Sequence, residues 1–265
     1  MKNESLINKF HEEILKIENR FDYIGINPKN LITPEFVQII TDLKELLSRK
    51  EFLEIESLQE DSDLSYLAEK LRHIYSRYYF YLEKNSAENL ILNKTTDFLS
   101  NNKGIGDKEL KCAKLNKKSH IFLIGSGPFP WTAINYAKSK GCLVTCIDNN
   151  STAVSLSRKL IKTIDLDNLI NVSKGLAQEV DYAQATHVVI TGMAIPKEPI
   201  LKQIYKTSRK NVKIIIRSSF GLYFFMYPSI NPHKFRNFKV NQIINNGPNS
   251  ELMSYILSKR HMGYN

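Results

Sequence analysis

A glycine-containing turn and a later aspartate are the first residues in the chain whose types and spacing suggest chemistry. The stretch IFLIGSGPFPW places Gly125, Ser126 and Gly127 after an apolar run and before residues with helical spacing. Glycines here allow a tight turn and close approach of the backbone to a ligand. Asp148 follows 21 residues after Gly127, and a carboxylate in this place accepts hydrogen bonds from ribose hydroxyls. The pattern favours an adenosine-type ligand, with S-adenosylmethionine (SAM) ahead of NAD; the alternative is an ordinary turn beside a surface aspartate.

Two prolines in the same turn change what it can bind. Pro130 stands where a dinucleotide-binding turn has its third glycine, and Pro128 comes two residues before it. Each proline removes one backbone N–H donor and stiffens the chain, so the turn offers fewer donors than a pyrophosphate group needs. We expect a rigid wall beside the ligand, unless the prolines only shape the start of the helix.

The elements that must hold this turn alternate in type along the second half of the chain. Apolar runs predict strands at 119–124, 143–147, 170–173, 187–191 and 212–216, with helices at 129–140, 151–163 and 197–208. This alternation predicts a parallel sheet with helices on both faces. Two more runs, 238–244 and 252–258, predict an antiparallel hairpin. The expected fold class is α/β, with an N-terminal helical bundle and a class I methyltransferase-like Rossmann domain that ends in this hairpin.

The first half of the chain is predicted to be helical. TPEFVQIITDLKELL predicts a helix with Thr33 as its N-cap and Pro34 at its first helical position. A longer helix is expected over 62–84, and Ser86 is expected to cap another that ends near Leu99. The polar, glycine-bearing stretch that follows is typical of a link between domains.

Net charge divides the chain near the same point. Residues 1–116 hold 17 basic and 20 acidic side chains, a net charge of −3, whereas residues 117–265 hold 20 and 7, a net charge of +13. We therefore place a helical domain at 1–116 and a SAM-binding Rossmann-like domain at 117–265. A basic half could bind RNA or an anionic cofactor. Its lysines are scattered, however, so we expect a solvated basic surface and no nucleic-acid partner.

Composition argues against several other classes of protein. Hydrophobic residues make up 42% and charged residues 24% of the chain, as in soluble globular proteins. No apolar run reaches the roughly 18 residues of a membrane span, and the charged N-terminus lacks the apolar core of a signal peptide. We expect a cytoplasmic protein without a membrane partner. Cys142 and Cys146 lack a second Cys or His pair and the six histidines show no ligand spacing, so we expect no bound metal.

Four stretches together resemble the nicotianamine synthase family and its bacterial metallophore relatives. They are FLIGSGPFPWTAI, CIDNNSTAVSLSRKLI, IRSSFGLYFFMYPSI and YLEKNSAENLI, and the resemblance spans roughly residues 20–228. The last stretch places Glu83 at the catalytic acid position of the family. The segment NNKGIGDKELKCAKL has no tyrosine, whereas nicotianamine-making members are tyrosine-rich before the first strand. This difference points to the staphylopine-type branch, which joins one aminobutyrate unit to histidine.

The resemblance implies a specific reaction. The 3-amino-3-carboxypropyl (aminobutyrate) group of SAM would pass to the α-amine of histidine, with release of methylthioadenosine, and we expect D-histidine rather than L-histidine. The product would be part of a staphylopine-like opine metallophore, whose pathway would also contain an amino-acid racemase and an opine dehydrogenase. Three alternatives remain: a nicotianamine-type synthase that condenses SAM units, a SAM-dependent methyltransferase acting on a small molecule or RNA, and a non-catalytic SAM- or nucleotide-binding sensor.

The resemblance also implies roles for particular residues. Glu83 would be the general base, and Tyr79, one helical turn earlier on the same face, would contact the substrate. Without the resemblance, Glu83 would be read as a solvated surface charge. The residues expected at SAM are Gly125, Ser126, Gly127, Pro128, Asp148, Asn149, Gly175, Leu176, Ala177, Gly192, Met193 and Ala194. Arg217, Ser218 and Ser219 are expected to bind the substrate carboxylate, although Arg217 could equally pair with an acid of the helical half.

Overall fold

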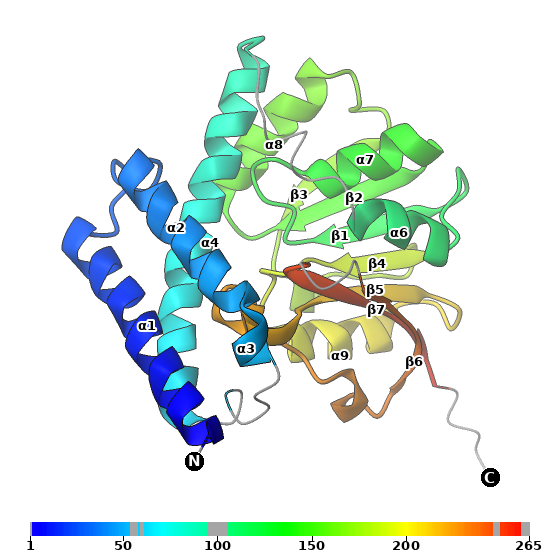
Figure 1. The fold of residues 1–265 in the computed structure, drawn as a ribbon. Coiled ribbons are helices and arrows are strands. Elements are labelled where there is room, and N and C mark those ends of the chain that lie inside the picture. Colours follow the sequence, from blue (N-terminus) through cyan, green and yellow to red (C-terminus); the bar gives the residue numbers. More distant parts are fainter. Residues whose placement is uncertain (1, 54–57, 59–60, 95–104, 246–249, 261–265) are drawn as a thin grey trace. The chain divides into compact units, whose positions relative to one another are not determined.

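The structure is a computed structural model of the 265-residue chain (Figure 1). It describes residues 2–53, 58, 61–94, 105–245 and 250–260. Within these residues the chain forms two compact units. The first comprises Met1–Leu82 and Ser219–Ser229, and the second comprises Glu83–Ser218 and Ile230–Asn265. The units divide after Leu82, whereas the sequence analysis placed the boundary after residue 116. No helix within the described ranges has the length and apolar character needed to cross a bilayer.

The first unit is built from helices. They are α1 (Lys2–Ile24), α2 (Pro34–Ser48), α3 (Lys50–Leu53) and the first part of α4 (Ser62–Ile91). The Thr33 hydroxyl accepts a hydrogen bond from the Phe36 N–H at 3.3 Å, which confirms the predicted N-cap of α2. Helix α4 runs through Ser86 without a break, so the prediction of a second helix capped there is wrong; its expected end at Leu99 lies outside the described residues.

Aromatic side chains fill the core of this first unit. The Phe10 ring lies 5.1 Å from the Phe52 ring and 5.6 Å from the Phe225 ring, centroid to centroid. The Tyr75 and Tyr227 hydroxyl groups share a hydrogen bond of 3.1 Å. The segment Ser219–Ser229 therefore contributes to the helical core, although the sequence analysis assigned it to the Rossmann-like domain.

The second unit contains a seven-stranded sheet in the order β3-β2-β1-β4-β5-β7-β6. The strands are β1 (His120–Ile124), β2 (Leu143–Asp148), β3 (Ile170–Lys174), β4 (His187–Ile190), β5 (Lys213–Ser219), β6 (Phe238–Asn245) and β7 (Leu252–Lys259). Strands β1 to β5 pair in parallel, and β6 pairs with β7 in antiparallel fashion. The sheet confirms the predicted α/β class, with its parallel part and its terminal hairpin.

Helices alternate with the parallel strands, as the sequence predicts. Helices α7 (Trp131–Lys140), α8 (Ser151–Thr163) and α9 (Lys197–Thr207) follow β1, β2 and β4 (Figure 1). Strand β4 is buried along its whole length, and β5 is buried beyond its first residue. Burial of consecutive residues means that both faces of the sheet are covered. The carboxyl ends of these strands therefore form one accessible edge, where ligands of such sheets bind.

Helix α6 (Ile105–Cys112) occupies part of the stretch that the sequence analysis read as a link between domains. It contacts α7, β6 and β7 within the second unit. The Ala113 carbonyl after α6 accepts hydrogen bonds from His187 Nε2 at 3.1 Å and Lys213 Nζ at 2.9 Å. These bonds anchor the segment to β4 and β5. The interpretation as a link is therefore wrong for α6, which is an integrated element of the Rossmann-like unit.

Candidate active site

The glycine turn joins β1 to α7 at the carboxyl edge of the sheet. Gly125 and Gly127 both have positive φ angles, +72° and +68°, in the left-handed region that favours glycine. Space also matters at Gly125. A Cβ atom there would lie 2.7 Å from Thr191 Oγ1 and 3.0 Å from the Ala194 Cβ. The first glycine therefore allows the turn to pack directly against the loop after β4.

The prolines leave the start of α7 poor in anion donors. Pro130 is the N-cap residue and makes no side-chain capping bond, and Pro128 is buried beside it. The N–H of Trp131 donates to the Phe129 carbonyl at 2.7 Å. These features fit the predicted rigid wall, because the prolines lack N–H groups and the first helical N–H already has a partner.

Asp148 ties the end of β2 to the glycine turn. Its Oδ2 accepts a hydrogen bond from the Gly127 N–H at 2.9 Å, and its Oδ1 accepts one from the Asn150 N–H at 2.9 Å. Each carboxylate oxygen can accept two hydrogen bonds, so both retain capacity for a ligand. Asn149 beside it is exposed. The sequence predicted a carboxylate at this edge but not its bond to the turn.

The Glu83 carboxyl lies directly against Gly127. A Cβ built on Gly127 would collide with Glu83 Oε2 and would lie 3.2 Å from Glu83 Cδ. The residue is partly buried, and no hydrogen bond to its carboxyl is found in the described part of the chain. Burial raises the pKa of Glu83 well above its usual range, and the nearby Asp148 carboxylate raises it further. Both effects favour the protonated form of the Glu83 carboxyl.

Two more strand ends contribute to this edge. After β3, the Gly175 N–H donates to the Asp148 carbonyl at 3.0 Å. Ala177 is buried, whereas the Leu176 side chain is 41% exposed. After β4, Thr191 Oγ1 donates to the Gly125 carbonyl at 3.0 Å. The ends of four adjacent strands thus come together around the turn, as the sequence analysis expected for the residues it assigned to SAM.

The family model described as nicotianamine synthase protein matches residues 7–264, nearly the whole chain. The chain belongs to the nicotianamine synthase family. Two solved structures of MtNAS share this fold. A glutamate-to-glutamine variant has a TM-score of 0.80, covering 96% of this chain and 98% of its own at 16% identity. The complex with MTA and tNA has a TM-score of 0.79, covering 96% and 97% at 16% identity.

Relatives that match this chain in sequence have a name more specific than that of the family. L-histidine 2-aminobutanoyltransferase of Yersinia pestis is 26% identical over 129 residues, which are 49% of this chain and 48% of that protein. The enzyme of the same name from Pseudomonas aeruginosa strain UCBPP-PA14 is 26% identical over 122 residues, which are 45% of this chain and 46% of that protein. The chain thus spans about half the length of the curated relatives it matches.

In this family member, Arg217 makes an internal ion pair. Its Nε and Nη2 donate to the Glu109 carboxylate at 3.0 and 2.7 Å, and Nη1 and Nη2 reach Thr132 Oγ1 at 3.2 Å. Tyr136 and Ser254 donate to the same carboxylate at 2.5 and 2.6 Å. Burial opposes the charge of Glu109, but the guanidinium outweighs it and lowers the Glu109 pKa. Glu109 lies within residues 1–116, where the sequence analysis expected a possible acid partner, although α6 belongs to the second unit. The predicted role of Arg217 at the substrate carboxylate stays a prediction.

The two serines after Arg217 are buried. Ser218 Oγ accepts a hydrogen bond from the Ile230 N–H at 3.0 Å, and the Ser219 N–H donates to the Pro228 carbonyl at 3.4 Å. These bonds join the two ends of the segment Ser219–Ser229, which belongs to the first unit, where the chain leaves the second unit and returns to it. The structure thus gives both serines internal contacts, and their predicted role at the substrate carboxylate stays a prediction.

Tyr79 belongs to the helical unit and lies one turn before Glu83 on α4. Its ring is 5.9 Å from the Tyr75 ring, centroid to centroid. Tyr79 therefore packs against an aromatic neighbour of the same helix. A contact of Tyr79 with the substrate stays a prediction.

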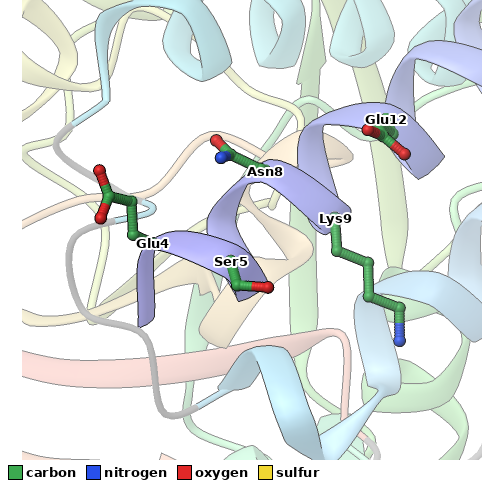
Figure 2. Close-up of a pocket in the computed structure, with 5 residues that line it drawn as sticks. All are labelled: Glu4, Ser5, Asn8, Lys9 and Glu12. Atoms are coloured by element: carbon green, nitrogen blue, oxygen red, sulfur yellow. The ribbon is translucent and has the colours of Figure 1, made fainter. Parts of the chain in front are cut away.

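One further region, on α1, carries no functional assignment. Figure 2 shows a depression lined by Glu4, Ser5, Asn8, Lys9 and Glu12, all on α1, whose side chains point in several directions and do not converge. Lys9 instead pairs with Glu51 at 3.1 Å. Among the residues that the structure describes, no three His, Cys, Asp or Glu side chains gather as a possible metal site.

Proposed function

We propose that this protein transfers the aminobutyrate group of SAM to the α-amine of histidine and releases methylthioadenosine. The observation that carries the proposal is the Glu83 carboxyl, which lies against Gly127 of the glycine turn in a member of the nicotianamine synthase family. The names of the curated relatives, histidine 2-aminobutanoyltransferases, support both the transferred group and the acceptor.

The expected stereochemistry of the histidine acceptor differs between the sequence analysis and the names of the relatives. The sequence analysis expects D-histidine, whereas the curated relatives are named for L-histidine. We therefore propose L-histidine as the first acceptor to test, because it has support from relatives of known name. The D form stays a prediction, which the same assay examines.

The residues at the sheet edge fit SAM as a co-substrate. Gly125 and Gly127 let the turn lie directly against the loop after β4 and against the Glu83 carboxyl, at the carboxyl edge of the sheet. The two oxygens of Asp148 retain acceptor capacity for the ribose hydroxyls. The Asp148 carboxylate supplies negative charge, which complements a sulfonium or ammonium group. In support, one solved structure of MtNAS is a complex with SAM.

The proposed chemistry needs a base and a fixed geometry. When bound, SAM supplies a sulfonium with three electrophilic carbons, so position decides which of them reacts. A C–N bond would form at the aminocarboxypropyl carbon, and the C–S bond would break with its electron pair left on the sulfur of methylthioadenosine. Glu83 would accept the proton that the acceptor amine loses. The turn, stiffened by Pro128 and Pro130, would hold the reacting groups in place.

Product analysis tests the proposed reaction. Purified protein is incubated with SAM and either L- or D-histidine, and mass spectrometry identifies both products. We expect methylthioadenosine and an aminobutyrate–histidine adduct in equal amounts. S-adenosylhomocysteine as the main product would indicate a methyltransferase, and abundant product without histidine would indicate a nicotianamine-type synthase. The absence of turnover with every acceptor, despite SAM binding, would favour the sensor alternative.

Asp148 provides a second prediction, on binding. Asp148→Ala should weaken SAM binding by about 1–3 kcal/mol, the scale of a lost hydrogen bond to a charged group. Calorimetry measures the affinity, and Asp167→Ala, at an exposed aspartate outside the helices and strands, serves as the control. Unchanged affinity in Asp148→Ala would contradict the ribose assignment.

The wider setting follows from the same proposal. An aminobutyrate–histidine product would need further steps to become an opine metallophore, and the family resemblance suggests an opine dehydrogenase and, for D-histidine, a racemase. These partners and the cytoplasmic location stay predictions.

A further inference from the structure

Lys197 is a buried lysine at the start of α9. Only 6% of the residue is exposed. Its Nζ donates hydrogen bonds to the Gly192 carbonyl at 2.8 Å and the Ala194 carbonyl at 2.9 Å. The Lys197 side chain therefore holds the backbone of the loop that follows β4 by two hydrogen bonds.

This buried charge has no acidic partner within the described residues. Burial alone lowers the pKa of Lys197 to about 7. The contrast with Arg217 is clear, because that buried cation pairs with Glu109. A buried ammonium without a counter-ion destabilises a fold relative to an apolar side chain of similar size. The two backbone hydrogen bonds are the contacts that Lys197 makes against this cost, and both lie in the loop after β4.

The loop that Lys197 holds, Thr191–Ala194, packs on the glycine turn. Thr191 Oγ1 donates to the Gly125 carbonyl at 3.0 Å, and a Cβ on Gly125 would lie 3.0 Å from the Ala194 Cβ. The contacts run without a gap from Lys197 through the Ala194 backbone to the turn. Any movement of this loop would change the space beside Gly125.

We infer that Lys197 is a positioning residue, which fixes the Thr191–Ala194 loop as one wall of the co-substrate site. The inference rests on the proposed function, because it assigns this edge of the sheet to SAM. Lys197 itself is buried behind the loop carbonyls and acts through them. It is expected to change SAM binding without touching SAM.

The test compares Lys197→Met with Lys202→Met, an exposed lysine of the same helix that pairs with Glu198 at 2.9 Å. Three quantities are measured: the melting temperature, amide hydrogen exchange of the ligand-free protein, and the Kd for SAM. Lys197→Met removes a buried charge but also the donor of two loop carbonyls, and these effects oppose each other, so its melting temperature should change by only a few degrees. Its amides at 125–127 and 191–194 should exchange about tenfold faster or more, and its Kd for SAM should rise about tenfold or more. Lys202→Met should change none of these.

Several outcomes would overturn the inference. Unchanged exchange in both segments would show that Lys197 does not hold the loop. A lower melting temperature with faster exchange throughout the unit, or failure to fold, would assign Lys197 a purely structural role. Lys197→Gln, which retains an N–H donor, should show smaller changes in the same direction. If the unaltered protein does not bind SAM, the proposed function fails, while the exchange comparison still decides whether Lys197 holds the loop.

Discussion

Glu83→Gln is expected to lower the rate of methylthioadenosine release by about 10²-fold or more, the scale of a lost general base. Glutamine keeps the shape of the side chain against Gly127 but cannot accept the proton of the acceptor amine. The Kd for SAM should change little, because Asp148 and the glycine turn are unaltered. Turnover is followed by chromatography of methylthioadenosine, and SAM binding by calorimetry.

The pH dependence of the unaltered protein provides an independent check. Burial and the Asp148 charge raise the pKa of Glu83, so the carboxylate needed as a base is lost as the pH falls through that raised value. Turnover should therefore decline at a higher pH than an ordinary carboxyl group would cause. Glu83→Gln should lack this step and regain part of its activity at high pH, where more acceptor amine is already neutral. Asp148→Asn should move the step to lower pH, since it removes a like charge.

A matched control lies on the same helix. Glu88 is a partly exposed residue of α4 that pairs with Lys84 at 3.3 Å, and Glu88→Gln should retain full turnover. Near-normal turnover of Glu83→Gln at neutral pH would exclude the base role. A large loss of SAM binding in Glu83→Gln would instead indicate that Glu83 holds the co-substrate.

The parallel strands and the glycine turn could be predicted because their signals are local. Apolar runs of strand length alternate with helical spacing, and Gly125 and Gly127 mark a turn that only glycine forms easily. Asp148 was found by its distance from the turn. Its hydrogen bond to the Gly127 N–H was not predicted, because it depends on how two loops meet.

The errors arose where local composition and tertiary packing disagree. The stretch containing Glu109 is polar and glycine-bearing, which favours a link, yet α6 forms there because Glu109 finds Arg217, Tyr136 and Ser254 as partners. Ser86 has the type of an N-cap residue, but α4 continues through it and buries it. Ala87, the next residue, is also buried in this helix. A pattern of apolar residues followed past Ser86 would have been needed to predict that the helix continues.

Gly127→Ala is expected to damage the site through the contact between the turn and Glu83. The added Cβ meets two obstacles: a φ of +68°, and the Glu83 carboxyl at the place the Cβ would occupy. The left-handed conformation alone costs about 1–2 kcal/mol for a residue with a Cβ. The collision would displace Glu83 or the turn, and a displacement near 1 Å can lower turnover by about 10²-fold. Turnover and the Kd for SAM should therefore both worsen.

Gly141→Ala separates the cost of a positive φ from the cost of the collision with Glu83. Gly141 ends α7 with a φ of +63°, and a Cβ there would meet nothing within 4 Å. Urea unfolding of Gly141→Ala should therefore show only the conformational cost of about 1–2 kcal/mol, with turnover unchanged. In a Glu83→Ala background, where the colliding carboxyl is gone, adding Gly127→Ala should cost about the same 1–2 kcal/mol. The contrary result would be that Gly127→Ala lowers the free energy of unfolding no more than Gly141→Ala does and leaves SAM binding intact. The backbone strain at Gly127 would then account for the whole effect, and the close packing of Glu83 on the turn would be refuted.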